Sequence, residues 1–288
     1  MFSERLEADA RAIAAKFDVV LSEFDDLPVT RAMRWATNGG KRLRGFLVLE
    51  GARLHDVPQF RAIWPASAIE AMHAYSLVHD DLPAMDDDDL RRGQPTVHVK
   101  WDEATAILAG DALQALAFEL TTRPDVGKPE IRADLALTLA RAAGAHGMVL
   151  GQALDIAAES ADKPLSLDEI TALQSGKTGE LIAWAAMAGP RLAGESPARM
   201  RLYADALGLA FQIHDDILDV EGDVEKTGKR LQKDADAGKA TFVSLLGLDA
   251  ARKRAKSLVE EACDALAPYG SRADTLRETA RFVIARES

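Results

Sequence analysis

An aspartate-rich run at residues 79–93 restricts what this chain can fold into more than any other stretch. Six carboxylates fall within ten positions, and two arginines and a glycine follow at once. Like charges this close together repel, and the fold loses stability unless something neutralises them. Bare carboxylates are typical ligands of a hard divalent cation, whereas the alternative is a solvated acidic turn. The six are Asp80, Asp81, Asp86, Asp87, Asp88 and Asp89.

A second acidic motif favours the metal-binding interpretation. The tripeptide His-Asp-Asp occurs at 79–81 and again at 214–216, each time after an apolar run of helical type. Asp215 and Asp219 are four positions apart, so on a helix they lie about 40° from each other on one face. Ile213 and Ile217 predict a partly buried helix, in which unpaired carboxylates are costly. The alternative is a helix end with a solvated acidic face.

Composition favours an all-α fold. Of the 288 residues, 48% are hydrophobic but only 6% are aromatic, and alanine and leucine dominate. The net charge of −11 argues against a nucleic-acid-binding surface, although local basic clusters can still hold anionic substrates. Cys263 is the only cysteine, which excludes an internal disulfide and argues against a thiolate metal site.

No targeting or membrane-spanning segment is expected. The first residues carry charges early and lack the apolar core of a signal peptide. Apolar runs also stay shorter than the eighteen or so residues that cross a bilayer. We therefore predict a cytoplasmic protein without a membrane span.

Hydrophobic periodicity predicts helices along the chain. The helix expected over 60–82 is apolar nearly all round, which indicates a central position in its domain. There is no strand alternation and no clean linker, so we expect one all-α domain over residues 1–288. A short helix is expected to end at residue 36, and another is expected to begin at 166. Other helices are expected at 3–24, 101–120, 130–143, 145–159, 197–220, 249–267 and 271–286.

A glycine-rich turn at residues 39–44 is a candidate phosphate site. It reads Gly-Gly-Lys-Arg-Leu-Arg and opens a new helix, whose free backbone N–H groups favour anions. Lys41 and Arg44 add positive charge to this candidate phosphate site. The alternative is a basic, solubilising helix start.

Three further residues flank the first acidic run. His73 lies seven residues before Asp80, nearly on the same helical face, although a lone histidine there can also be a hydrogen-bonded core residue. Arg91 and Arg92 directly follow the aspartates, which suggests an anionic substrate bridged by cation and guanidinium. Pro83 interrupts the helix, and a local bulge there would return Asp86 to the Asp80 face.

Two lysine-bearing stretches complete the candidates. Gly179 lies inside a predicted helix, where a kink would expose Lys177 and its carbonyl, unless the glycine serves only packing. Residues 221–241 are polar and turn-rich, and we interpret them as a mobile lid whose Lys229 and Lys239 meet phosphate.

Together these motifs resemble the trans-isoprenyl diphosphate synthases. Residues 80–86 resemble the first aspartate-rich motif in its bacterial form with two inserted residues, and 215–219 resemble the second. The turn at 39–42, Lys177-Thr178 and Gly238-Lys239 match in order. Gly45 departs from the pattern, because the family usually has proline there, and we expect it to loosen the helix start.

The resemblance implies a fold, partners and a residue assignment. The family fold is a bundle of ten or more helices around a deep cavity, and its members are usually homodimers. By resemblance, a trinuclear Mg²⁺ cluster, with Mn²⁺ possible, is held by Asp80, Asp86 and Asp215, with Asp81, Asp216 and Asp219 close by. The allylic diphosphate is assigned to Arg91, Lys177, Lys229 and Lys239, isopentenyl diphosphate to Lys41, Arg44, His73 and Arg92, and the carbocation to Thr178, Gln212 and the Lys177 carbonyl.

The implied reaction is ionisation, condensation and elimination. Cations stabilise the departing diphosphate, isopentenyl diphosphate attacks the allylic cation, and a proton is lost. Tyr75 and Ser76 lie five and four residues before Asp80. In the family, a bulky side chain at this place closes the bottom of the cavity. An aromatic residue here, together with the two inserted residues, resembles the pattern of the bacterial farnesyl diphosphate synthases. On an ideal helix, however, Tyr75 lies about 140° from Asp80. We predict a C15 product, with geranyl or geranylgeranyl diphosphate as alternatives.

Three other functions compete with this interpretation. A terpene cyclase would normally replace the second motif with an Asn/Asp-Ser/Thr-Glu triad. A non-catalytic partner subunit tends to lose one aspartate motif, whereas both are intact here. A calcium-binding module of EF-hand type would need glycine and glutamate at spacings that the acidic run lacks.

Overall fold

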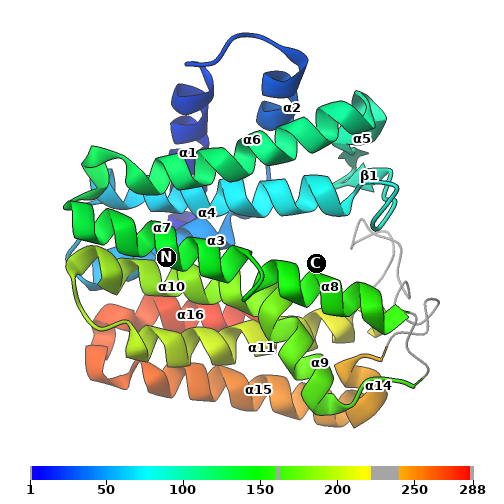
Figure 1. Ribbon diagram of the computed structural model, residues 1–288. Coiled ribbons are helices and arrows are strands. Elements are labelled where there is room, and N and C mark those ends of the chain that lie inside the picture. Colours follow the sequence, from blue (N-terminus) through cyan, green and yellow to red (C-terminus); the bar gives the residue numbers. More distant parts are fainter. Residues whose placement is uncertain (1, 160–162, 222–239, 286–288) are drawn as a thin grey trace. The chain divides into compact units, whose positions relative to one another are not determined.

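The computed structural model describes residues 2–159, 163–221 and 240–285. Figure 1 traces a chain built almost entirely of helices, so the all-α prediction is confirmed. The chain divides into two compact units, one formed by residues 1–137 and 188–195 and the other by 138–187 and 196–288. Whether they act as the single predicted domain stays a prediction.

The first unit is organised around one helix, α4 (Gln59–Asp80). Ile69, Met72 and most of its alanines are fully buried, which fits the prediction of a central helix apolar nearly all round. Helices α3 and α6 pack along it, and α4 and α6 run side by side in Figure 1. The unit also contains α1 (Phe2–Leu21), α2 (Pro28–Ala36), α3 (Leu43–Leu54), β1 (Leu90–Arg91), β2 (Gln94–Pro95), α5 (Val97–Lys100), α6 (Glu103–Thr122), η1 (Pro124–Val126), the start of α7 (Pro129–Ala143) and the end of α10 (Glu180–Ala193).

A short hairpin is a feature of the first unit that the search for strand alternation did not predict. In the described residues, β1 and β2 pair antiparallel, with Leu90 opposite Pro95 and Arg91 opposite Gln94. The two residues between them, Arg92 and Gly93, have φ values of 53° and 72°, the left-handed backbone of a tight two-residue hairpin turn. Two-residue strands are too short to leave an alternating hydrophobic pattern, which is why periodicity missed them.

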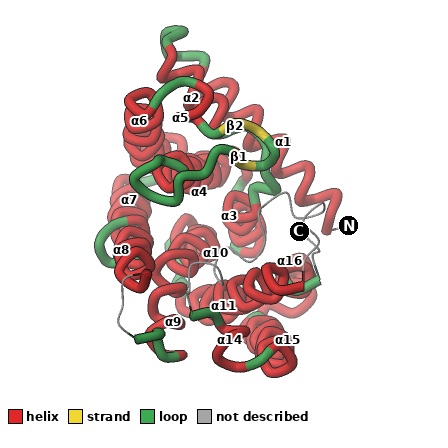
Figure 2. Tube along the Cα trace, turned by 90° about the vertical axis from the view of Figure 1, so that its right-hand side faces the viewer, coloured by secondary structure: helices red, strands yellow, loops and turns green. Residues whose placement is uncertain are grey.

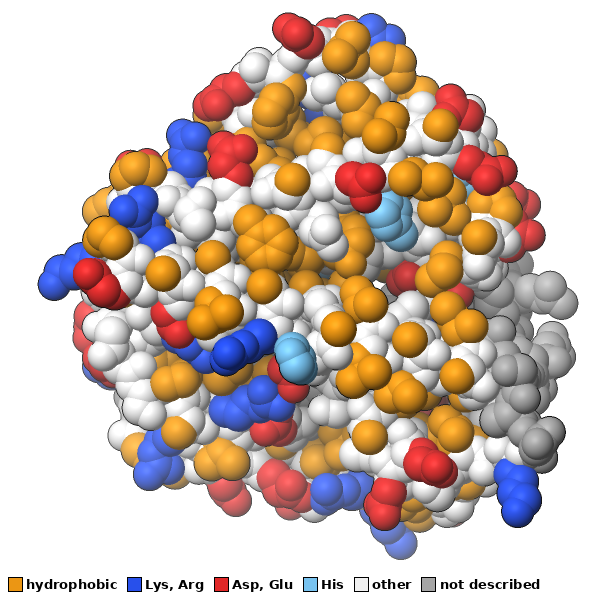
Figure 3. All heavy atoms as spheres, in the orientation of Figure 1, with side chains coloured by type: hydrophobic (Ala, Val, Ile, Leu, Met, Phe, Trp, Pro, Cys, Tyr) orange, Lys and Arg blue, Asp and Glu red, His pale blue; other side chains and the backbone are white. Residues whose placement is uncertain are grey.

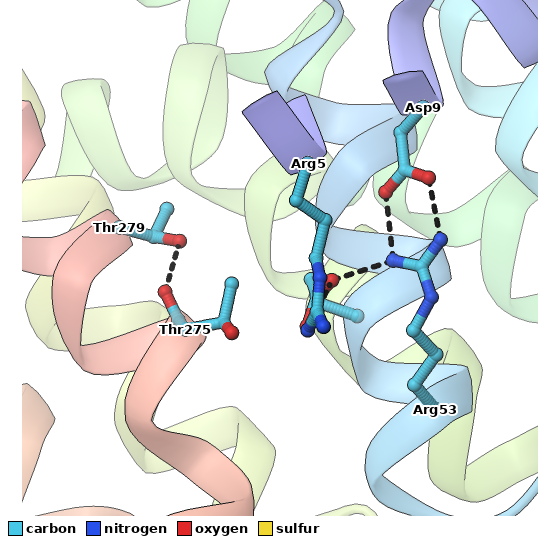
Figure 4. A network of polar contacts seen from close by, with 6 residues as sticks. Arg5, Asp9, Arg53, Thr275 and Thr279 are labelled. Atoms are coloured by element: carbon cyan, nitrogen blue, oxygen red, sulfur yellow. Dashed lines mark hydrogen bonds and ion pairs between the residues drawn. The ribbon is translucent and has the colours of Figure 1, made fainter. Parts of the chain in front are cut away.

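Helix α1 is fastened to α3 by a buried ionic network. The Arg53 guanidinium donates to Asp9 at 2.5 and 2.8 Å and to Glu50 at 2.5 Å. Figure 4 shows the forked contact between Arg53 and Asp9, and Arg5 approaches Glu50 at 3.3 Å. Both carboxylates are nearly inaccessible, with Asp9 2% and Glu50 4% exposed. Burial raises the pKa of Glu50, and the cations of Arg53 and Arg5 oppose that rise.

The second unit is built on α11 (Ala198–Glu221), which packs along α15 (Leu248–Ala265). The Tyr203 hydroxyl of α11 is buried and donates to the Leu276 carbonyl at 2.9 Å. Figure 2 shows the helical character of these elements in red. The unit also contains the end of α7, α8 (Met148–Glu159), α9 (Leu167–Gln174), the π-helical segment η2 (Ser175–Gly179), the start of α10, α14 (Phe242–Leu246), η3 (Ala267–Ala273) and α16 (Asp274–Val283).

Helix boundaries follow local capping chemistry. Asp102 accepts a hydrogen bond from the Thr105 backbone at the start of α6. Ser166 and Glu169 form the reciprocal capping box of α9, so both predicted helix starts are confirmed. At the far end of the chain α16 begins at Asp274, three residues later than expected, because η3 intervenes. None of the described helices is long and apolar enough to cross a membrane.

Replacing Arg53 with methionine tests the buried network. The substitution leaves Asp9 and Glu50 buried without their main cation. Burial already raises the pKa of Glu50 in the folded protein, and loss of the opposing Arg53 charge should raise it further above its unfolded value. An acid with a raised pKa costs stability above its unfolded pKa, and that cost fades as pH falls. Urea unfolding should therefore show a loss of about 1–3 kcal/mol at pH 7, which shrinks toward pH 4.

Arg11→Met provides the matched control. Arg11 and Glu7 form an exposed pair at 3.7 Å on α1, one helical turn apart. Pairs of this kind contribute about 0.5 kcal/mol or less. Equal, pH-independent losses in the two variants would contradict the role given to Arg53.

Candidate active site

The turn after α4 folds the first acidic run back onto the helix end. The Asp86 N–H donates to the Asp80 carbonyl at 2.8 Å, and the Asp88 N–H donates to the Asp81 carbonyl at 3.3 Å. These bonds satisfy carbonyls that a helix end leaves unpaired. The return of the chain from Asp86 to Asp80, hypothesised from Pro83, is thus present in the backbone.

Asp81 of this run is buried and bonded to an arginine of the same unit. Its carboxylate is 4% exposed and accepts from the Arg91 guanidinium at 2.5, 2.7 and 3.0 Å. Burial raises the pKa of Asp81, and the Arg91 charge opposes that rise. Arg91 also lies 3.7 Å from Asp88. Arg91 is therefore held in place at the edge of the acidic turn.

The glycine-rich turn before α3 forms part of a pocket within the first unit. The pocket has a volume of about 270 Å³ and is lined by Arg91, Arg92 and Asp81, but not by Lys41, Arg44 or His73. The other lining residues are Trp35, Ala36, Asn38, Gly39, Gly40, Ala74, Leu77, Val78, Gln94, Pro95, Thr96 and Val97.

Gly40 suits its position for two reasons. Its φ of 77° is a backbone conformation that favours glycine, and a Cβ there would lie 2.7 Å from the Arg92 guanidinium carbon. The Arg92 side chain thus rests directly against the glycine turn, and its Nη1 donates to the Asn38 carbonyl at 3.4 Å. The structure therefore brings Arg92 to the glycine-rich turn predicted as a candidate phosphate site.

The basic residues of this turn differ in role. Arg42 is buried, donates to the Thr37 carbonyl at 2.7 Å and lies over the Phe17 ring, so it stabilises the turn itself. Lys41 is exposed and Arg44 is half-buried. Both remain candidates for an anion.

Gly45 corrects the expectation of a loosened helix start. Its N–H donates to the buried Glu70 carboxylate at 2.8 Å, a bond that proline cannot make. A Cβ at this position would lie 2.5 Å from Ile13, so glycine also allows α1 and α3 to approach closely. This helix start is tied to its neighbours.

Tyr75 faces α6. The Tyr75 ring is buried and meets the His79 imidazole edge to face, with ring centroids 5.5 Å apart. His79 Nε2 lies 3.0 Å from the Ile107 carbonyl, and a Cβ on Gly110 would come within 2.1 Å of that nitrogen. Gly110 therefore makes the room in which His79 supports Tyr75.

The side chains next to Tyr75 have different surroundings. Ser76 is buried and donates to the His73 carbonyl at 2.9 Å, so its hydroxyl is satisfied within α4. His73 itself is half-buried.

In the second unit a π-helical turn presents Lys177. The expected kink near Gly179 exists as η2, an arrangement that often occurs at functional sites. Lys177 Nζ contacts Asp155 of α8 at 2.6 Å. A Cβ on Gly151 would lie 2.1 Å from the Lys177 backbone nitrogen, so this glycine lets α8 approach the π turn.

The second acidic motif also buries its middle aspartate. Asp216 is 6% exposed and accepts from the Phe242 N–H at 2.7 Å and from Gln212 Nε2 at 3.2 Å. The Thr178 hydroxyl donates to Gln212 Oε1 at 3.4 Å. Asp216 thereby joins α11, the π turn and the start of α14, whereas Asp215 and Asp219 are half-buried on α11.

Some predictions cannot be located, and some contributing residues were missed. Lys229 and Lys239 lie outside the described residues. Sequence reasoning gave no role to Trp35 or Asp155. The available signal for Asp155 was Gly151 one helical turn before it, a small residue next to an acid on one helix face.

The donor set of both motifs suits a hard divalent cation. Asp80 and Asp86 are brought together by the returning backbone, and Asp215 and Asp219 share a face of α11. All are oxygen ligands of the kind Mg²⁺ prefers. Within the described residues no group of three or more His, Cys, Asp or Glu side chains gathers as a ready ligand set.

Comparison with known proteins identifies the family. The polyprenyl synthetase family model matches residues 28–269. The chain belongs to the polyprenyl synthetase family. It is 43% identical over 299 residues to farnesyl diphosphate synthase of Haemophilus influenzae, covering 100% of this chain and 99% of that one. It is 46% identical over 277 residues to the Escherichia coli farnesyl diphosphate synthase, with 92% and 91% covered.

Solved structures agree on the fold of this polyprenyl synthetase. An apo FPP/GFPP synthase from Zymomonas mobilis matches with a TM-score of 0.91 and 44% identity over 98% of both chains. A geranyltranstransferase from Thermotoga maritima matches with a TM-score of 0.82 and 28% identity, over 98% and 99%. The resemblance drawn from the motifs and the predicted isoprenoid-synthase fold are confirmed.

Gly151→Ala tests the contact that positions Lys177. The new methyl group would meet backbone atoms of the π turn, which cannot rotate away, so we expect a loss of about 1–3 kcal/mol in urea unfolding. Gly179→Ala is the control, because the nearest atom to its Cβ is 3.7 Å away and its stability should change by about 1 kcal/mol or less. A Gly151→Ala protein as stable as its parent would contradict this packing.

Proposed function

We propose that this polyprenyl synthetase is a farnesyl diphosphate synthase. It condenses isopentenyl diphosphate head to tail with dimethylallyl or geranyl diphosphate to give (2E,6E)-farnesyl diphosphate. The observation that carries the proposal is the near full-length similarity to farnesyl diphosphate synthases, with both aspartate motifs intact. Geranyl and geranylgeranyl diphosphate remain the alternative products.

Asp80, Asp86 and Asp215 are proposed to hold Mg²⁺, or Mn²⁺ in its place. The bound metal supplies charge stabilisation for the diphosphate that leaves the allylic substrate. Asp81 and Asp216 support this set indirectly, because each is already bonded within the protein. Asp219, one turn after Asp215, is proposed to lie close to the metal.

Two cations of the allylic site are oriented by carboxylates. Arg91 is held by Asp81 and Lys177 by Asp155, so both are fixed before any substrate arrives. Preorganised charges of this kind lower the barrier to ionisation, because they need no reorganisation during the reaction. Lys229 and Lys239 are proposed to add to this site.

Isopentenyl diphosphate is assigned to the basic turn and its neighbours. Arg92 rests on Gly40, and Lys41 and Arg44 belong to the same turn. These residues, with His73, would bind the diphosphate and leave the double bond directed at the allylic carbon. Attack forms the new carbon–carbon bond, and the proton released afterwards goes to the free diphosphate.

The allylic cation needs a polar but non-nucleophilic surrounding. Thr178 and Gln212 are hydrogen-bonded to each other, and Gln212 donates to Asp216. These bonds fix the orientation of both side chains, and donation by the Thr178 hydroxyl leaves the lone pairs of its oxygen available. With the Lys177 carbonyl they would stabilise the cation without adding to it, and exclusion of water protects it.

A homodimer is proposed as the working assembly. Ile107 and Leu108 on α6 are exposed, and α8 exposes Val149, Leu150, Leu154 and Ile156. Figure 3 shows hydrophobic side chains across the outward face of α8. Exposed apolar residues at this density commonly mark a protein interface. The cytoplasmic location expected from the sequence stays a prediction.

Asp80→Ala and Asp215→Ala should abolish turnover and leave the fold intact. Each removes a proposed metal ligand, and loss of several kcal/mol of charge stabilisation corresponds to a rate reduction of about a thousandfold or more. Diphosphate release from dimethylallyl plus isopentenyl diphosphate, with and without Mg²⁺, measures the effect.

Asp89→Ala is the control for the carboxylate variants. Asp89 belongs to the same acidic run but is exposed and not assigned to the metal. Its rate should stay within about threefold of the parent, as expected for an exposed charge. Near-parental rates in Asp80→Ala or Asp215→Ala would refute the metal assignment.

Tyr75→Ala should lengthen the product. Removing the ring opens space next to His79, and five helical residues below Asp80 correspond to a depth of about 7.5 Å. Tyr75→Phe keeps the ring contact with His79 and should leave the product unchanged. Chromatography of the chain lengths made from geranyl diphosphate decides, and identical products from all three proteins would place the floor elsewhere.

A further inference from the structure

The β1–β2 hairpin carries Arg91 and Arg92 and is attached to its unit from several sides. Arg91 binds Asp81 at the end of α4, and the Thr96 N–H donates to the Asp89 carbonyl at 3.0 Å, which closes the base of the hairpin. On the strand β2 side, the Trp35 indole N–H donates to the Pro95 carbonyl at 3.0 Å. That bond joins the hairpin to α2, just before the glycine-rich turn.

The indole of Trp35 is itself held in a fixed orientation. Lys100 Nζ lies 3.0 Å from the Trp35 ring centroid, and the Trp101 ring meets Trp35 edge to face at 6.2 Å. Cation–π and edge-to-face contacts of this kind restrict the rotation of the ring. Lys100 is the last residue of α5, the helix that follows the hairpin, and Trp101 comes next. Trp35 therefore joins α2 to both the hairpin and the end of α5.

Arg92 is sensitive to any shift of this hairpin. It occupies a central position of the two-residue turn with a φ of 53°, which is strained for a residue other than glycine. Pro95 lies opposite Leu90 in the same ladder, so movement of β2 displaces the turn. The Arg92 guanidinium lies against Gly40, so close that a Cβ on this glycine would be 2.7 Å from the guanidinium carbon. A shift of the turn would therefore change this contact.

Trp35 and Arg92 also border the same space. Both line the pocket of about 270 Å³, together with Gly39 and Gly40 of the basic turn. Pro95, which accepts the indole N–H, lines the pocket as well. Trp35 therefore connects the two segments that provide positive charge, the glycine-rich turn and the hairpin.

We propose that Trp35 is a positioning residue that holds Arg92 against Gly40 and thereby sets the affinity for isopentenyl diphosphate. The inference rests on the proposed function, which supplies the substrate of Arg92. The position of Arg91 should not depend on Trp35, because Asp81 holds Arg91 separately. The loss of Trp35 should therefore affect one substrate and spare the other.

Trp35→Phe removes the indole N–H and keeps an aromatic ring against Lys100. We expect KM for isopentenyl diphosphate to rise about three- to tenfold, the effect of losing one hydrogen bond. The KM for geranyl diphosphate and kcat should each change by about twofold or less. Calorimetric titration with isopentenyl diphosphate alone should show the same weakening.

Trp64→Phe is the matched control. Trp64 is a tryptophan of the same unit that also lies between cations, Lys16 at 3.9 Å and Arg123 at 4.9 Å, but neither cation belongs to the hairpin. Its KM values should match those of the parent. An equal rise of both KM values in Trp35→Phe, or the same rise in Trp64→Phe, would reduce Trp35 to a general structural role and overturn the inference.

A double-mutant cycle tests whether Trp35 acts through Arg92. In an Arg92→Gln background, Trp35→Phe should add about twofold or less to KM, because the residue that it positions is gone. Additive effects would contradict the inference. A parent protein that forms no prenyl product would instead refute the proposed function, whereas an active parent with an unchanged KM in Trp35→Phe refutes only this inference.

Discussion

Repulsion among crowded carboxylates is the constraint on which both acidic motifs depend. Each His-Asp-Asp motif resolves it in the same way, by burying its second aspartate and bonding it within the protein. Asp81 receives Arg91, and Asp216 receives the Phe242 N–H and Gln212. The first aspartates, Asp80 and Asp215, stay half-buried. One acid of each pair thus builds the structure, and the other is the one that we propose as a metal ligand.

Much of the helical framework was predictable from the sequence because it follows from local chemistry. The apolar stripe of α4, the Asp102 cap and the capping box at Ser166 all depend on residues a few positions apart. Gly179 likewise indicated the break that the structure shows as a π turn. The family followed from short motifs whose residues and order are specific.

What the sequence could not provide are contacts between distant segments. The approach of Gly151 to Lys177, the bond from Gly45 to Glu70 and the bond from Trp35 to Pro95 leave no periodic signal. The hairpin was missed because its strands are two residues long, and its turn uses a strained arginine that propensity does not favour. Gly45 was misjudged for the same reason, since its role lies in a partner 25 positions away.

The most direct measurement is the chain length of the product. The protein would be incubated with Mg²⁺ and isopentenyl diphosphate, and with dimethylallyl or geranyl diphosphate in separate tubes, followed by chromatography of the prenyl chains. The account predicts a C15 product from both starters. A C10 or C20 product would keep the chemistry but contradict the role of Tyr75, and the absence of any metal-dependent product would contradict the proposed function.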